Sequence, residues 1–265
     1  MSPPIAVLGM YDFDEVRDAT DTLWGAIAAR LPDAPDRLTR PESHAELHAS
    51  WRSPVLVLSQ SCGWPLVTEL ADLVDVGGLG VVGTFYYTAA DEPGYYRSVI
   101  VESNDFGRSE SDGDTPLRAA VNSYDSLSGW VSLAAERGDA ITDVVITGSH
   151  VASLAHVRAG SADVASIDAV TYSMLKRHRP FAVNGVHIVG RGPRVPCLPL
   201  STTLDVDMVR WAIRDALDDA TVQAATAELG IAGFVPLDAE AYASLREYSA
   251  VANIRYDRPG NSDRS

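Results

Sequence analysis

DVVITGSHVASLAHVRAG, residues 143–160, is the stretch that decides the fold. It begins with a largely apolar run at 143–146, which predicts a buried strand. Polar residues follow at 147–150, and residues 149–158 then form a helical pattern that Gly160 ends. A strand that passes directly into a helix is the repeating unit of parallel α/β sheets, so this segment predicts an α/β fold.

The same alternation of short apolar runs and helical patterns extends on both sides of this segment, which favours a mainly parallel sheet. The further strands that we expect are 5–8, 55–58, 80–83, 97–101, 117–121, 162–167 and 186–189, and the further helices are 14–31, 126–135, 169–176 and 206–220. We expect a polar loop at 108–114 and a frayed tail after about residue 254.

The charge of the chain excludes several functions. Its 21 basic and 36 acidic residues give a net charge of −15, so it lacks the basic surface that nonspecific nucleic-acid binding needs. Lys176 is the only lysine and does not follow a glycine-rich loop. This argues against a Walker A nucleotide site and against a pyridoxal Schiff base, so we predict no cofactor.

The N-terminal residues lack the features of a secretory signal. The first basic residue is Arg17, and the early apolar run at 5–8 is short. No stretch approaches the roughly 20 apolar residues of a membrane helix. We therefore expect a cytoplasmic protein as encoded, or a periplasmic one if a signal was removed.

Two pairs of residues raise the question of a metal or a disulfide. Cys62 and Cys197 fit no zinc motif, and two buried thiols are favoured over a disulfide, which sequence cannot test. His44 and His48 have the spacing of metal ligands on a helix, but the residues between them do not give the HExxH pattern. A solvated helix face is the favoured interpretation, and no metal site is predicted.

A serine-rich segment follows the expected strand 117–121. Ser123, Ser126 and Ser128 lie where the chain enters a helix, and hydroxyls and free backbone N–H groups at a helix N-terminus suit an anion such as phosphate. An ordinary helix cap with additional serines is the alternative.

Two further strand ends carry polar groups. Ser149 and His150 follow the strand 143–146, and the histidine could donate to an oxyanion or simply lie at the surface. Asp168 follows the strand 162–167, where ligands of parallel sheets collect. Its carboxylate could accept from an amine, a hydroxyl or His150, or it could only cap the next helix.

The first part of the chain adds aromatic and polar candidates. Gln60 and Cys62 follow the strand 55–58, and Tyr11 follows the strand 5–8. Tyr95 belongs to a cluster with three other tyrosines, which suits a small-ligand cleft or packing around a hairpin-like loop. A serine-hydrolase triad is disfavoured because there is no Gly-x-Ser-x-Gly elbow.

Taken in order, these segments resemble a known family. The resemblance runs from near the start to about residue 205, and it is carried by Met10-Tyr11-Asp12, LSQSCGWPL at 58–66, GYYRS at 94–98, NSYDSLSGW at 122–130, TGSH at 147–150 with Ala152-Ser153, ADVA at 162–165 with Asp168-Ala169-Val170, and Leu198-Pro199. The chain is similar to the phosphonate/phosphite-type substrate-binding proteins of ABC transporters, which have the type II periplasmic-binding-protein fold.

This resemblance implies two α/β lobes joined by two hinge crossings, with the ligand held between the lobes. Lobe 1 would combine residues 1–97 and 191–265, and lobe 2 would be 98–190. The set of ligand-binding residues that we expect is Tyr11, Gln60, Cys62, Tyr95, Ser123, Ser126, Ser128, Ser149, His150 and Asp168.

Within this set the resemblance gives the residues different roles. Ser126, Ser128, Ser149 and His150 would grip phosphonate oxygens, and Asp168 would face the ligand. Tyr11 and Tyr95 would close the site.

The function that follows is capture of a small oxyanion (a phosphonate, phosphite or phosphate-like anion) for an ABC transporter permease, without catalysis. One alternative is a cytosolic enzyme on the same fold, in which Cys62 and His150 would be the reactive groups. Another is a ligand-sensing module with a different small organic ligand.

Overall fold

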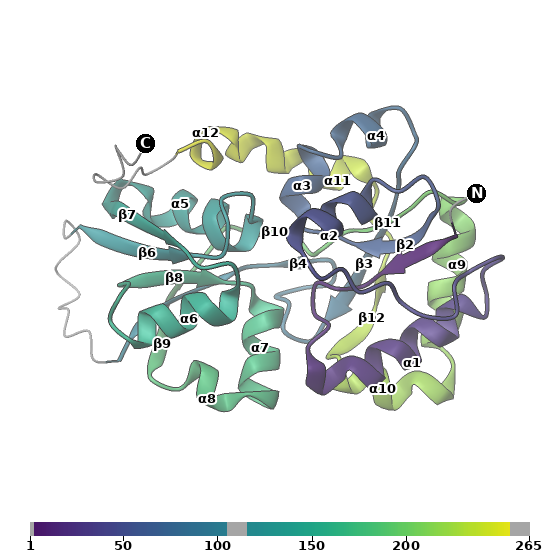
Figure 1. Ribbon diagram of the computed structural model, residues 1–265, viewed down its shortest axis with the longest axis horizontal. Coiled ribbons are helices and arrows are strands. Elements are labelled where there is room, and N and C mark those ends of the chain that lie inside the picture. Colours follow the sequence, from purple (N-terminus) through teal and green to yellow (C-terminus); the bar gives the residue numbers. More distant parts are fainter. Residues whose placement is uncertain (1–2, 105–115, 255–265) are drawn as a thin grey trace. The chain divides into compact units, whose positions relative to one another are not determined.

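The computed structural model describes residues 3–104 and 116–254, and the chain divides into two compact α/β units. Unit 1 comprises Met1–Tyr96 and Val195–Leu245, and unit 2 comprises Arg97–Arg194 and Arg246–Ser265. Figure 1 labels the elements of both units. The polar loop expected at 108–114 and the tail expected after residue 254 lie outside the described residues.

The chain passes between the units at three points, where sequence analysis expected two. The first two, 96/97 and 194/195, lie within a few residues of the expected boundaries. The third, 245/246, assigns the C-terminal residues to unit 2, whereas we had expected them in lobe 1. The reason is the short helix α12 (Ser249–Ala252), which packs against α5 (Ser132–Arg137) of unit 2.

The core of unit 1 is a five-stranded sheet in the order β1-β2-β11-β3-β12. β1 and β2 are parallel, while β11 is antiparallel to β2 and β3, and β12 is antiparallel to β3. The strands are β1 (Ile5–Val7), β2 (Leu56–Gln60), β3 (Gly80–Tyr87), β11 (Leu200–Thr202) and β12 (Ile231–Val235), and a separate antiparallel pair is formed by β4 (Tyr95–Tyr96) and β10 (Val195–Pro196).

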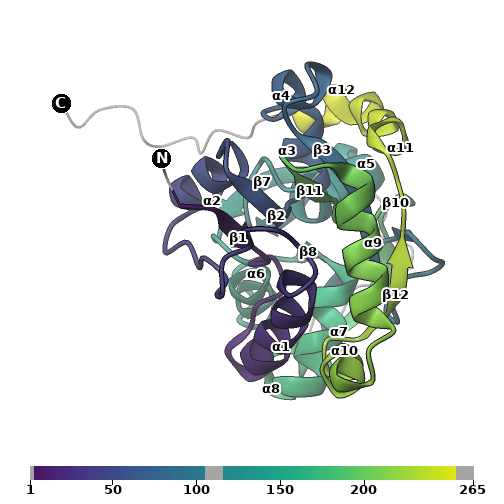
Figure 2. The ribbon, with the colours of Figure 1, turned by 90° about the vertical axis from the view of Figure 1, so that its right-hand side faces the viewer.

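Helices cover the sheet of unit 1. The helices are α1 (Arg17–Ala28), α2 (His44–Trp51), α3 (Gly63–Val67), α4 (Ala71–Asp75), α9 (Val206–Leu217), α10 (Gln223–Glu228) and α11 (Ala239–Ala243), with 3-10 turns at Asp14–Val16, Ala220–Val222 and Ser244–Tyr248. Figure 2 shows α1, α9 and α10 grouped together, in agreement with their mutual contacts. Leu23, Trp24 and Ile27 of α1 are almost fully buried, as their helical spacing predicts.

The sheet of unit 2 also has five strands, in the order β7-β6-β8-β5-β9. β7, β6 and β8 are parallel to one another, and β5 is antiparallel to both β8 and β9. The strands are β5 (Val99–Ser103), β6 (Leu117–Val121), β7 (Ile141–Ile146), β8 (Val164–Ile167) and β9 (Val186–Arg191). Because three neighbouring strands run in the same direction, their carboxyl ends meet at one edge of the sheet.

The helices of unit 2 begin at this edge. α5 follows a π-helical turn at Leu127–Val131, and α6 (His150–Arg158) and α7 (Ala169–His178) follow β7 and β8. Unit 2 also contains α8 (Pro180–Val183), a 3-10 turn at Gly138–Ala140 and the helix α12 described above. In Figure 1, α5 and α6 lie on opposite faces of the sheet. Within the described residues, no helix combines the length and the apolar character needed to cross a membrane.

Candidate functional site

Three helix starts gather at the carboxyl edge of the unit 2 sheet, and each is capped by a side chain that sequence analysis selected. The Oγ of Ser126 accepts from the backbone N–H of Gly129 at 3.0 Å, and the Oγ of Ser149 accepts from Ala152 at 3.1 Å. The carboxylate of Asp168 accepts from the N–H of Thr171 at 2.9 Å. Ser126 and Asp168 thus form the helix caps that were considered for them, and Ser149 forms a third.

Capping does not use all the donors at these helix starts. An N-cap satisfies one or two of the four N–H groups that lack a partner within the helix. Asp168 also places a buried carboxylate, 3% exposed, at the start of α7. The starts of the π-helical turn and of α6 are capped by neutral serines, so they are the two that favour an added anion.

Two of these segments are joined by a direct side-chain contact. The Oγ of Ser128, in the turn that follows β6, lies 3.0 Å from Nε2 of His150 in the first turn of α6. The backbone carbonyl of Ser128 accepts from the Oγ of Ser166 on β8 at 2.6 Å. The hydroxyl and the imidazole are thereby fixed by groups from all three parallel strand ends.

The surroundings of His150 favour its neutral form. Its side chain is half-buried, but its Nδ1 atom is fully buried and, among the described residues, has no hydrogen bond of ordinary geometry. Burial lowers the pKa of the imidazole, and the carboxylate of Asp168 and the backbone of Ser166 oppose that shift. A neutral imidazole beside a hydroxyl is a hydrogen-bonding pair that can reorganise toward a bound anion.

Asn122 is the residue of this edge that sequence analysis did not include in the site. It comes directly after β6, and within the described part of the chain its buried Oδ1 atom has no hydrogen-bond partner. A Cβ atom on Gly129 would lie 1.8 Å from this oxygen, so the glycine is needed for the close approach. Its position at the end of a parallel strand is the signal that could have identified it.

The remaining candidates in unit 2 lie farther from this contact. Ser123 is half-buried, and its carbonyl accepts from the N–H of Ser126 at 3.4 Å. Ser149 is exposed and caps α6, while its neighbour Thr147 bonds Ser153 at 2.7 Å. Both serines therefore belong to the helix starts, and within the described part of the chain neither is hydrogen-bonded to Ser128 or His150.

Unit 1 brings together two of its four candidates. The amide of Gln60 donates to the hydroxyl of Tyr87 at 3.0 Å, and the ring of Tyr11 meets that of Tyr87 edge to face with centroids 5.2 Å apart. Tyr87 is the last residue of β3, which extends beyond the expected strand 80–83 and pairs there with β12. Gln60 and Tyr11 are both buried.

The other two candidates of unit 1 lie on separate elements. Cys62 directly precedes α3, and Tyr95 is half-buried on β4. Cys62 and Cys197 are both buried and are not joined in a disulfide, which confirms the favoured interpretation. Cys62 belongs to unit 1 and His150 to unit 2.

Buried hydroxyls without partners also occur in unit 1. Among the described residues, the Oγ atoms of Ser61 and Ser201 are buried and make no hydrogen bond, and both serines are at most 1% exposed. Sequence analysis missed Ser201 because β11 is only three residues long and was not predicted.

Comparisons with known proteins agree with this architecture. A family model described as the periplasmic phosphonate substrate-binding protein of ABC transporters matches residues 71–242, well over half of the chain. No curated protein gives a match.

Solved structures of this kind are similar in fold. A binding protein component of an ABC phosphonate transporter from Pseudomonas aeruginosa has a TM-score of 0.72 at 15% identity, over 95% of this chain and 87% of that one. PhnD1 from Prochlorococcus marinus, in complex with methylphosphonate, has a TM-score of 0.72 at 14% identity, over 95% and 98%. A Xanthomonas citri protein bound to ATP has a TM-score of 0.66 at 16% identity, over 95% and 97%.

Proposed function

Because this chain belongs to the family of periplasmic phosphonate substrate-binding proteins of ABC transporters, we propose that it binds a small phosphonate, phosphite or phosphate-like anion through unit 2. The observation that carries the proposal is the Ser128–His150 contact between two serine-capped helix starts at the carboxyl edge of three parallel strands.

Hydrogen-bond donors and helix dipoles would carry the recognition. The backbone N–H groups that remain at the two helix starts and the hydroxyls of Ser126 and Ser128 can donate to anion oxygens. The His150 imidazole would donate after reorganising around the bound anion. A site of this kind needs little net positive charge, so it is compatible with a chain whose net charge is −15.

We propose supporting roles for the other expected residues. Asp168 would face a hydroxyl or an amine of the ligand, and Ser123 and Ser149 would shape the helix starts. In unit 1, Tyr87 accepts a hydrogen bond from Gln60 and contacts the ring of Tyr11, and such a group suits a surface that receives an apolar substituent. Cys62 and Tyr95 would take part in ligand binding beside this group.

The family is one of transport binding proteins, and we propose that this chain likewise binds its ligand without changing it. Its protein partner would be the permease of an ABC transporter. After overnight incubation of protein with excess methylphosphonate, the ³¹P NMR spectrum should contain only the starting resonance. A new phosphorus resonance that depends on the protein would contradict binding without catalysis.

The proposed ligand class is tested by calorimetric titration of protein that has been unfolded, dialysed and refolded to remove any copurified ligand. The four ligands to be compared are methylphosphonate, phosphite, phosphate and 2-aminoethylphosphonate. At least one should bind with one-to-one stoichiometry. Failure of all four to bind refolded protein of native circular dichroism would overturn the proposal.

A further inference from the structure

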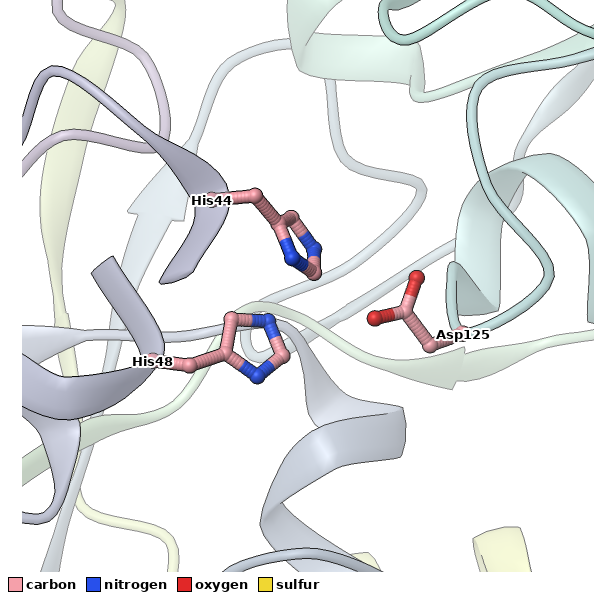
Figure 3. Close-up of side chains that lie close together, drawn as sticks. All are labelled: His44, His48 and Asp125. Atoms are coloured by element: carbon pink, nitrogen blue, oxygen red, sulfur yellow. The ribbon is translucent and has the colours of Figure 1, made fainter. Parts of the chain in front are cut away.

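Two histidines of unit 1 lie one turn apart on the same side of α2. The ring centroids of His44 and His48 are 4.0 Å apart, and Figure 3 shows the two imidazoles projecting from the helix side by side. His44 is exposed, and the side chain of His48 is 18% exposed. The pair therefore combines the i, i+4 spacing of a helical chelate with access from solvent.

The backbone under this pair is well defined. The Oγ of Ser43 caps α2 by accepting from the N–H of Glu46 at 3.2 Å. The carboxylate of Glu46 accepts in turn from the N–H of Glu42 at 2.9 Å, which is a reciprocal bond of the capping-box type. Both histidines are consequently carried by a helix whose first turn is fixed.

A carboxylate orients one of the two rings. Nδ1 of His48 lies 2.6 Å from Oε2 of Glu69, in the segment between α3 and α4. The segment is held in place by Arg52, which donates to the backbone carbonyl of Glu69 and pairs with the carboxylate of Asp72 at 2.6 Å. Since Nδ1 faces the carboxylate, Nε2 is the nitrogen that His48 would present to a metal ion.

From this arrangement we propose that unit 1 carries a surface site for a divalent transition-metal ion of the Zn²⁺, Ni²⁺ or Cu²⁺ class. His44 and His48 would be its two protein ligands, and water would occupy the remaining positions. Imidazole is a preferred ligand of these ions. A carboxylate bonded to the second nitrogen of a metal-binding histidine is the arrangement that fixes the ring and raises its basicity.

From the sequence alone, the favoured interpretation of His44 and His48 was a solvated helix face. The spacing was compatible with a helix face that only contacts solvent, because two histidines without further partners rarely form a site. Glu69 is 21 residues from His48 in the sequence, so its contribution is visible only in the folded unit. The site does not depend on the proposed anion-binding function.

The test is a titration of the full chain with ZnCl₂ by calorimetry, together with Cu²⁺ electron paramagnetic resonance. The wild type should bind one Zn²⁺ ion, and the Cu²⁺ spectrum should show coupling to two imidazole nitrogens. H44A and H48A should each lower the Zn²⁺ affinity more than 10-fold and leave a single coupled nitrogen. H187A removes an exposed histidine of unit 2 and is the matched control, which should bind as the wild type does.

Glu69→Gln tests whether the Glu69 carboxylate orients the His48 ring for metal binding or only supports the local structure. It keeps the side-chain shape but removes the charge, and we expect a loss of Zn²⁺ affinity of about 10- to 100-fold with the two-nitrogen Cu²⁺ signal retained. The circular dichroism spectra of H44A and H48A should equal that of the wild type, which checks that both variants fold. Absence of Zn²⁺ binding by the wild type, or equal affinities of wild type, H44A and H48A, would overturn the site.

Discussion

At the carboxyl edge of the unit 2 sheet, two buried polar atoms lack hydrogen-bond partners within the described residues. Buried polar groups usually have hydrogen-bond partners, and leaving one unsatisfied costs about 1–3 kcal/mol. Within the described residues, Oδ1 of Asn122 and Nδ1 of His150 lack such bonds although both atoms are buried. Both residues are at the ends of parallel strands or in the first turn of a helix, which is where an anion or an ordered water would satisfy them.

Ser128→Ala tests the hydroxyl that contacts His150. The variant removes a hydrogen-bonding group from the proposed anion site, and bonds to charged partners contribute about 1.5–3 kcal/mol. We therefore expect roughly a 10- to 150-fold loss of anion affinity by calorimetry. Ser161→Ala, an exposed serine beyond the far end of α6, is the control and should bind normally. Equal affinities of the two variants would remove Ser128 from the site.

The stability of ligand-free protein should depend on the protonation of His150. Burial lowers the pKa of this imidazole in the folded chain below its unfolded value of about 6.5. Above about pH 6.5, the His150 imidazole is mostly neutral in both the folded and the unfolded chain, so its burial does not lower the free energy of unfolding. As the pH falls further, the unfolded chain binds the proton first, so the free energy of unfolding declines until the folded pKa is reached.

Urea denaturation at pH 7.5 and 5.5 measures this effect. The wild type should lose more unfolding free energy between these pH values than His150→Asn, and the difference cannot exceed about 1.4 kcal/mol for each pH unit. An equal pH dependence of the two proteins would show that His150 does not titrate differently on folding.

At the scale of elements, the turn after β6 is set by a glycine. The chain enters the helix through a π-helical turn at Leu127–Val131, in which Trp130 and Val131 both donate to the carbonyl of Ser126. Sequence analysis expected an ordinary helix at 126–135 instead. Turns of this kind are frequent at functional sites because the wider ring changes where the backbone donors point.

Gly129→Ala should disrupt this turn. The added methyl would lie 1.8 Å from Oδ1 of Asn122, so the amide or the backbone must move, at a cost of about 1–3 kcal/mol for overpacking. Thermal denaturation should show a lower Tm, and anion affinity should fall with it.

Gly25→Ala is the matched control for that substitution. Gly25 is an exposed helix position with no atom within 4 Å of the added methyl, so the variant should gain about 0.5–1 kcal/mol of stability. If Gly129→Ala behaved like Gly25→Ala, the close contact with Asn122 would not constrain the turn.

The elements that could be predicted are those whose pattern is local. At β6, β7 and β8, an apolar run changes within a few residues to helical spacing. The strands, the helices that follow them and the polar caps between them could therefore be located. The short elements could not be found this way. α3 has every residue buried and no periodicity, and β10 and β11 are two and three residues long and are defined only by their partner strands.

For the candidate site, the sequence located the segments but not the contacts within them. The caps at Ser126, Ser149 and Asp168 follow from their positions before helices. The Ser128–His150 bond depends on the parallel pairing of β6 with β7, which joins residues 22 positions apart. The assignment of the residues after 245 to unit 2 likewise depends on packing, since the buried face of α12 is a single short turn.

At the scale of the whole molecule, the net charge of −15 opposes the approach of an anion. Fields of this kind act on association rates and are screened by salt, with a Debye length of about 30 Å at 0.01 M and about 8 Å at 0.15 M.

Stopped-flow measurements of methylphosphonate binding should therefore show an association rate that rises between about 10 mM and 150 mM NaCl, while the dissociation rate changes less. NaCl supplies chloride, which could compete for the site, so sodium gluconate of equal ionic strength is the control. An association rate that falls in both salts would indicate a local positive field that outweighs the net charge.

The central claim is that an oxyanion is bound by the helix starts of unit 2, and a crystal structure of the protein with methylphosphonate tests it most directly. We predict tetrahedral electron density within hydrogen-bond distance of the Ser126 and Ser128 hydroxyls and of the His150 imidazole, with backbone N–H groups of the two serine-capped helix starts donating to it. Well-defined ligand density that touches none of these three residues would contradict the account.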